Sequence, residues 1–120
     1  MEVLHTAIDV TDMEAQIDFY TELLGLEVTR EAAMDGQRMV WIGGDEGGEL
    51  QFLEADEREE PAGIDHLAVA TDDLDAAIEA ATSEWGSTLV IEPQTVGDEA
   101  RLAFVTDPEG YHVELIQELD

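Results

Sequence analysis

The 120-residue sequence predicts an α+β fold made of two βαβββ modules in tandem, related by a pseudo-twofold axis. Three observations predict this arrangement. Strand-like and helix-like segments follow one another in the order β-α-β-β-β twice, the second half repeats residues of the first at a nearly constant offset, and an acidic stretch separates the halves. At this length the two modules form a single domain.

The first module is expected to span about residues 1–55. Alternating apolar residues predict a strand over residues 3–10. Thr11, with Glu14 three residues later, predicts a helix N-cap, and Gly25 predicts the end of that helix. Three further strands are predicted over residues 26–33, 38–43 and 49–54.

The second module is expected to span about residues 63–120, after an acidic linker over about residues 56–62. It begins with a predicted strand over residues 64–71. A helix follows, with apolar residues at positions 74, 78, 81 and 85 and Gly86 as its end. Three strands are predicted over residues 88–93, 101–107 and 111–117.

The two modules repeat one another residue by residue. An offset of 61 produces seven identities between residues 5–25 and residues 66–86, including the histidines His5 and His66. After a two-residue insertion the offset becomes 63, and it then pairs Arg38 with Arg101, Trp41 with Phe104, and Gln51 with Glu114. Identities that respect the helix face, the helix end and the strand centres together indicate an internal repeat.

The charge of the chain excludes some partners. Thirty-one Asp and Glu residues stand against four arginines, and the formal net charge is −27. Nucleic acid and anionic membrane surfaces would repel this chain, so neither is an expected partner. Regular apolar periodicity argues against disorder. A densely carboxylated surface is typical of halophilic proteins, in which high salt screens the self-repulsion.

The residue types that are missing exclude some chemistries. Without cysteine the chain has no disulfide, thiolate nucleophile or cysteine metal site, and without lysine it has no Schiff-base chemistry. His, Glu, Asp and Tyr remain as candidates for catalysis. The N-terminus lacks a secretory signal and no apolar run approaches membrane-spanning length, so a cytoplasmic protein is expected.

Four polar residues occupy matched places in otherwise apolar strands. His5 and His66 lie in the first strand of each module, and Gln51 and Glu114 lie in the last. An unpaired polar group in such a place costs about 1–3 kcal/mol, so these residues are expected to have a use. If the pseudo-twofold brings both pairs together, their nitrogen and oxygen donors suit one divalent first-row metal with open positions for substrate.

The other candidate site residues have weaker support from the sequence. Arg38 and Arg101 could bind a substrate carboxylate, although surface ion pairing is the preferred interpretation in so acidic a chain. Three aromatic residues are candidate pocket walls or core residues: Trp41, Phe52 and Phe104.

Three stretches show a resemblance to a known family: "LHTAIDVTDMEAQIDFYTELLGLEV", "DHLAVATDDLDAA" and "FVTDPEGYHVELIQ". They resemble the vicinal oxygen chelate superfamily, the fold family of lactoylglutathione lyase, bleomycin resistance proteins and extradiol dioxygenases, and specifically its glyoxalase I-like members. The resemblance implies paired βαβββ modules around a divalent metal. It places the metal ligands at His5, Gln51, His66 and Glu114, makes Glu114 the proton-transfer base, and implies a homodimer with sites formed within one chain or by two chains.

The activity expected from the resemblance is that of a metal-dependent lyase or isomerase. The metal (Zn, Ni, Mn, Co or Fe) would chelate the vicinal oxygens of an α-oxo compound, typified by the adduct of methylglyoxal with a low-molecular-weight thiol. Bacterial glyoxalase I is similar but has glutamate at the place of Gln51, and its glutathione-contacting positions are Asp9 and Ala55 here. A different thiol, or none, is therefore an alternative to glutathione.

Three other functions remain open at this stage. An extradiol ring-cleaving dioxygenase needs two histidines and one glutamate, which His5, His66 and Glu114 would supply. A methylmalonyl-CoA epimerase-like isomerase shares the His, Gln, His, Glu set, but its second glutamate has no equivalent in "RMVWIG". A non-catalytic small-molecule-binding protein of the same fold is the third.

Overall fold

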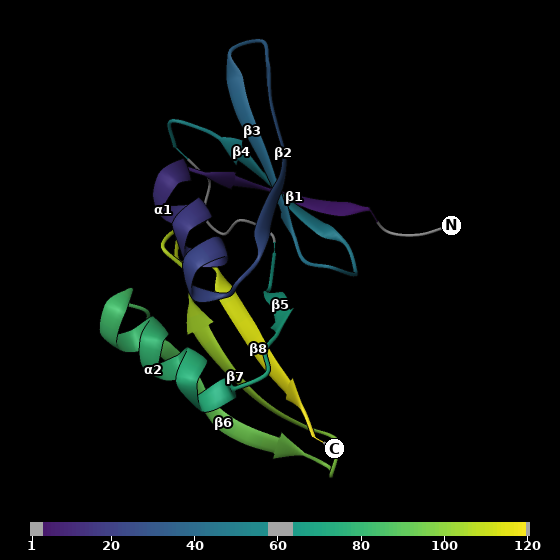
Figure 1. Cartoon of the computed structure of the whole chain (residues 1–120). Coiled ribbons are helices and arrows are strands. Elements are labelled where there is room, and N and C mark those ends of the chain that lie inside the picture. Colours follow the sequence, from purple (N-terminus) through teal and green to yellow (C-terminus); the bar gives the residue numbers. More distant parts are fainter. Residues whose placement is uncertain (1–3, 58–63, 120) are drawn as a thin grey trace. The chain divides into compact units, whose positions relative to one another are not determined.

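The computed structural model describes residues 4–57 and 64–119, except for the side chain of Met34. Within it the chain divides into two units, Met1–Ala62 and Gly63–Asp120, and each has its own sheet and helix (Figure 1). The predicted linker over residues 56–62 lies mostly outside the described residues. None of the helices in the described part of the chain is long and apolar enough to cross a membrane.

The first unit is a four-stranded mixed sheet with one helical segment. The sheet has the strand order β1-β4-β3-β2, in which β1 and β4 are parallel and the other neighbours are antiparallel. Its elements are β1 (His5–Val10), α1 (Met13–Asp18), a π-helical turn η1 (Phe19–Leu23), β2 (Glu27–Met34), β3 (Gln37–Gly43) and β4 (Glu49–Glu54).

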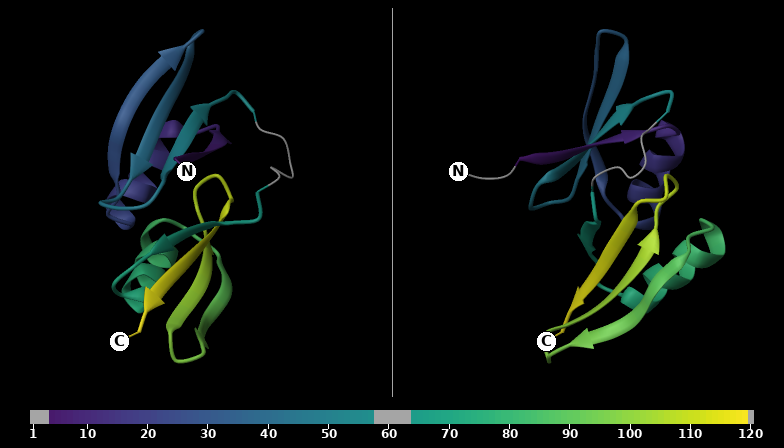
Figure 2. Two further views of the ribbon diagram at one scale, coloured as in Figure 1. Left: turned by 90° about the vertical axis from the view of Figure 1, so that its right-hand side faces the viewer. Right: turned by 180° about the vertical axis from the view of Figure 1, so that it is seen from behind.

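The second unit repeats this topology. Its sheet has the order β5-β8-β7-β6, with β5 and β8 parallel, and α2 contacts β7 and β8. Its elements are β5 (Leu67–Ala70), α2 (Leu74–Glu84), β6 (Leu89–Val96), β7 (Ala100–Thr106) and β8 (His112–Glu118). Figure 2 shows that the strands of each sheet twist and curve without closing into a barrel.

These two units confirm the predicted α+β fold of tandem βαβββ modules. Two local predictions differ from the structure. The first N-cap is Asp12 and not Thr11, because the Asp12 carboxylate accepts a hydrogen bond from the backbone N–H of Ala15, and Asp73 does the same for α2. The strand predicted over residues 64–71 is shorter, so His66 lies directly before β5 and not inside it.

Alternating side chains give each sheet one apolar face, and the helical segment of the unit covers that face. In the first unit Val10, Val40, Ile42 and Phe52 are fully buried, and the Phe52 ring lies 5.4 Å from the ring of Tyr20 on η1. Since successive residues of a strand point to opposite faces, the residues between these point away from α1 and η1. The candidate metal ligands of this unit, His5 and Gln51, are among the residues on that opposite face.

A β-bulge interrupts both sheets at equivalent places. In the first unit the register shifts between Val28 and Arg30, so Val28 pairs with Ile42 and Arg30 pairs with Trp41. In the second unit it shifts between Leu89 and Ile91, so Ile91 pairs with Phe104. A bulge puts two residues of one strand opposite a single residue of its neighbour. As a result, Arg30 of β2 lies opposite Trp41 of β3, and Ile91 of β6 lies opposite Phe104 of β7.

Phe52→Ala tests whether the apolar face of the first sheet holds that unit together. Deleting a fully buried ring from the contact with Tyr20 is expected to lower the free energy of unfolding by about 3–5 kcal/mol, measured by denaturant titration. Leu4→Ala, at a position that is 63% exposed, is the control and should change it by less than about 0.5 kcal/mol. Equal effects of the two substitutions would contradict this description of the core.

Candidate functional site

The first unit presents two candidate donors on the face of its sheet that points away from α1. The parallel register pairs His5 with Glu49 and Ala7 with Gln51, so His5 and Gln51 are on one face, two positions apart, on adjacent strands. Gln51 is 9% exposed, whereas His5 is exposed. The Gln51 amide nitrogen, Nε2, donates a hydrogen bond to Met39 Sδ at 3.5 Å. This contact leaves the amide oxygen as the group that can coordinate a cation.

The second unit brings its two candidate donors closer together. His66 Nε2 lies 3.5 Å from Glu114 Oε1, and the side chains are 36% and 17% exposed. The register explains this contact, because Glu114 pairs with Ala68, two positions from His66, and Ala68 is too small to separate them. The ring of Phe104 packs edge-on against the imidazole at 5.1 Å. Phe104 therefore forms a wall beside the histidine.

Asp65 orients the imidazole of His66. Its Oδ1 lies 2.7 Å from His66 Nδ1, so Nδ1 is the protonated nitrogen that donates to the carboxylate. Nε2 is the nitrogen that faces Glu114. A carboxylate on the far nitrogen of an imidazole is the arrangement that typically orients a metal-ligating histidine. Asp65 is not among the site residues predicted from the sequence, although it directly precedes His66 in the chain.

These donors fit a divalent first-row metal in their chemistry. Each unit offers one imidazole and one side-chain oxygen on the face opposite its helix, and nitrogen-plus-oxygen sets suit zinc and its neighbours in the first row. Within residues 4–57 and 64–119, no group of three or more His, Asp or Glu side chains is spaced to hold a metal ion by itself. Each unit therefore presents half of the predicted ligand set.

Arg38 and Arg101 point to the other face, toward the helix of their own unit. Arg38 bonds the carboxylates of Glu14 on α1 and Glu31 on β2, and Arg101 forms two 3.2 Å hydrogen bonds with Asp75 on α2. The hydrogen bond with Glu14 raises the pKa of Arg38, and the one with Asp75 raises the pKa of Arg101. These contacts support the ion-pairing interpretation of both arginines.

The candidate aromatic residues divide between the two faces. Phe52 is buried beneath η1, whereas Trp41 pairs with Gln51 and Phe104 pairs with Glu114 across the neighbouring strands. Trp41 and Phe104 thus lie beside the candidate donors, at equivalent positions of the repeat. Phe52 belongs to the core of the first unit.

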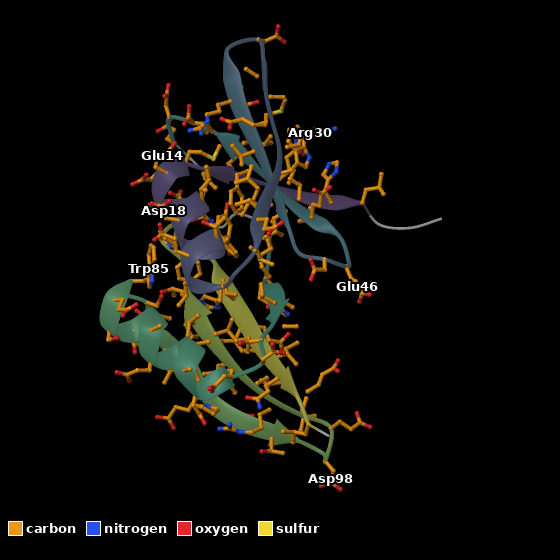
Figure 3. All side chains as sticks on the ribbon, in the orientation of Figure 1. Glu14, Asp18, Arg30, Glu46, Trp85 and Asp98 are labelled. Atoms are coloured by element: carbon orange, nitrogen blue, oxygen red, sulfur yellow. The ribbon has the colours of Figure 1, made fainter. Side chains whose placement is uncertain are left out.

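Arg30 also lies on the donor face of the first sheet, and it is not among the site residues predicted from the sequence. Its guanidinium carbon is 3.8 Å from the centre of the Trp41 ring, a stacked cation–π contact. Figure 3 shows Arg30 on the side of β2 that points away from Glu14 and Asp18 of α1. A difference between the two modules is the sequence signal that could have revealed Arg30, because its equivalent in the second module is Ile91.

Comparison with known proteins places the chain in a family. Residues 2–115 match the Glyoxalase/Bleomycin resistance protein/Dioxygenase superfamily. The chain belongs to this superfamily. It is 30% identical to the lactoylglutathione lyase of Escherichia coli O157:H7 over 100% of this chain and 95% of that protein. It is 28% identical to the lactoylglutathione lyase of Haemophilus influenzae over 98% and 93% of the two chains.

A solved structure of the same superfamily is similar throughout. The trypanothione-dependent glyoxalase I of Leishmania major is 26% identical, has a TM-score of 0.83, and is matched over 98% of this chain and 86% of that one. Glyoxalase and lyase membership is therefore supported by both sequence and fold.

Asp65→Ala tests the orientation of His66. Without the carboxylate the imidazole is expected to lose its preferred tautomer, and the affinity for Zn²⁺ or Ni²⁺ should fall about 10- to 100-fold in a competition titration with a chelating dye. Asp98→Ala is the matched control, because it removes one carboxylate from the exposed β6–β7 turn, which Figure 3 labels. Equal affinities of the two variants would contradict a role for Asp65.

Proposed function

We propose that this protein is a divalent-metal-dependent, glyoxalase I-like lyase or isomerase of α-oxo thiol adducts. The observation that carries the proposal is the His66–Glu114 pair, in which an oriented imidazole nitrogen and a carboxylate oxygen face each other at 3.5 Å. The relatives named lactoylglutathione lyase, each matched over nearly its whole length, support the reaction class.

His5, Gln51, His66 and Glu114 are the proposed metal ligands. The support is that each unit presents one imidazole and one oxygen donor at equivalent positions of its sheet, and that donor chemistry suits a first-row divalent ion. Glu114 is the single carboxylate of the set, because its counterpart in the first unit is the amide Gln51. We further propose that the protein forms a homodimer, as its resemblance to glyoxalase I-like proteins implies.

A divalent ion bound by these residues would supply Lewis-acid stabilisation to two adjacent oxygens of the substrate. Glu114 is the proposed base: its carboxylate takes the proton from the carbon that bears sulfur and hydroxyl, and returns it to the neighbouring carbonyl carbon. The electron pair of the broken C–H bond moves into the bond between the two carbons, and the hydroxyl proton of the first carbon is transferred to the former carbonyl oxygen. The hydroxy thioester is therefore an isomer of the hemithioacetal, and no other reactant is needed. Phe104 packs against His66 and pairs with Glu114, so the proposed base has an apolar side chain as its cross-strand neighbour.

Glu114→Gln tests the proposed base. With methylglyoxal and a small thiol as substrates, the variant is expected to lose about 100-fold or more in kcat, followed as thioester formation by ultraviolet absorbance. Glu118→Gln, at an exposed position of the same strand, is the matched control and should retain the activity. An active Glu114→Gln enzyme would remove Glu114 from the proton transfer. Iron in the purified protein with oxygen consumption on catechols would instead identify a dioxygenase.

Three histidine variants test the ligand set separately from activity. His5→Ala and His66→Ala are each expected to lose most of the bound metal, measured by elemental analysis after purification in concentrated salt, because two histidines supply all the nitrogen donors. His112→Ala is the control, since this exposed residue begins β8, pairs with Thr106 and is outside the proposed set. Unchanged metal content in His5→Ala would refute the set.

A further inference from the structure

The Gln51 side chain makes a contact that the proposed function does not use. Its amide nitrogen, Nε2, donates a hydrogen bond to the Sδ atom of Met39 on the neighbouring strand β3, at 3.5 Å. Gln51 is 9% exposed and Met39 is half-buried, so water is partly excluded from the contact. A thioether sulfur is a weak acceptor and has no hydrogen to donate. Of the two ends of the amide, the nitrogen is therefore the one that can bond this sulfur.

The residues that pair with Gln51 offer its amide nitrogen no side-chain acceptor. Ala7 on β1 and Trp41 on β3 are its partners in the sheet register. Alanine has only a methyl group, and an indole nitrogen only donates. The Trp41 Nε1 atom has no hydrogen-bond partner among the described residues, so it does not bond the amide oxygen either. The sulfur of Met39 is thus the neighbouring group that orients the amide.

The strand register places Met39 and His5 on opposite sides of Gln51. On β1, His5 pairs with Glu49, two residues before Gln51. On β3, Met39 pairs with Leu53, two residues after Gln51. A diagonal neighbour of this kind lies about 7–8 Å away, within reach of a long side chain. The contact with Met39 therefore draws the amide nitrogen away from the histidine and leaves the oxygen as the end that can share a cation with it.

The second unit differs at both positions of this pair. Leu102 stands at the place of Met39, because it pairs with Ile116, two residues after Glu114. Leucine has neither a donor nor an acceptor in its side chain. The Glu114 carboxylate has two equivalent oxygens, so no neighbour is needed to select the coordinating one, whereas an amide has one oxygen and one nitrogen. A weak acceptor thus lies beside the amide, and a hydrocarbon lies at the same position beside the carboxylate.

We propose that Met39 is a positioning residue that holds the Gln51 amide with its nitrogen at the sulfur and its oxygen free to bind the divalent ion. This inference rests on the proposed function, because it requires Gln51 to be a metal ligand. It goes beyond that function by stating how an amide can serve at a position where the other unit has a carboxylate. It concerns the first unit alone, since β1, β4 and β3 are neighbours in one sheet.

A double-mutant cycle in the full-length chain tests the inference through metal affinity. Met39→Leu removes the acceptor, keeps a similar volume, and introduces the residue type found at the equivalent position of the second unit. The affinity for Zn²⁺, measured by competition with a chelating dye, is expected to fall about 3- to 10-fold, the net contribution of one neutral hydrogen bond. Gln51→Glu supplies a carboxylate that needs no orienting acceptor. Adding Met39→Leu to Gln51→Glu is therefore expected to change the affinity by less than about twofold.

Leu102→Met is the matched control, because it makes the reverse exchange at the equivalent, also half-buried position beside Glu114. An ionised carboxylate has no hydrogen to donate to a thioether, so this variant is expected to keep the wild-type affinity for Zn²⁺. An equal loss in Met39→Leu and Leu102→Met would overturn the inference. A loss in Met39→Leu that persists unchanged in the Gln51→Glu background would assign the effect to packing and overturn it as well.

The inference and the proposed function fail in different ways. A protein that converts no methylglyoxal–thiol adduct, but loses Zn²⁺ affinity in Met39→Leu only when Gln51 is present, would contradict the reaction and support the role of Met39. An active lyase in which Met39→Leu leaves Zn²⁺ affinity unchanged would contradict the role of Met39 and leave the reaction standing. Unchanged Zn²⁺ affinity in Gln51→Ala would remove Gln51 from the ligand set and overturn the inference, while the test of Glu114 as the base would be unaffected.

Discussion

The parallel pairing of the first and last strands of each unit determines where the candidate donors lie. Because β1 lies beside β4 and β5 beside β8, residues far apart in sequence become neighbours on one face: His5 near Gln51, and His66 near Glu114. The period-two alternation of side chains then gives the opposite face to the apolar residues that the helix covers. A single-residue slip of either strand would exchange its two faces and bury the donors. The register that packs the core therefore also places the donors.

The two units share a frame but differ in the residues that it carries. Topology, N-cap, β-bulge and the arginine–helix ion pair all recur at equivalent positions. On the donor face the counterparts are unlike: Gln51 and Glu114, or Arg30 and Ile91. The repeated topology therefore places residues at matched positions in the two units, but the residues at those positions differ. At these positions the first unit carries an amide and an arginine, and the second unit carries a carboxylate and an isoleucine.

The sequence has four arginines against 31 acidic residues, so the contacts of each arginine are informative. Arg38 and Arg101 each join the helix of their unit to the sheet, and such exposed pairs contribute little to stability once salt screens them. Arg30 is held differently, over the face of an aromatic ring, where a guanidinium is attracted without a carboxylate.

The sequence by itself determined the α+β class, the tandem repeat and the order of the strands, because apolar periodicity and a residue-by-residue offset are local or countable properties. It also singled out His5, Gln51, His66 and Glu114, because polar residues at matched places in apolar strands are visible without coordinates. Only the tertiary structure decided that Asp65 bonds Nδ1 of His66, that Phe52 is a core residue, and that Arg30 stacks on Trp41. Those contacts depend on pairing register, on a bulge and on rotamers, which the spacing of residues along the chain does not specify.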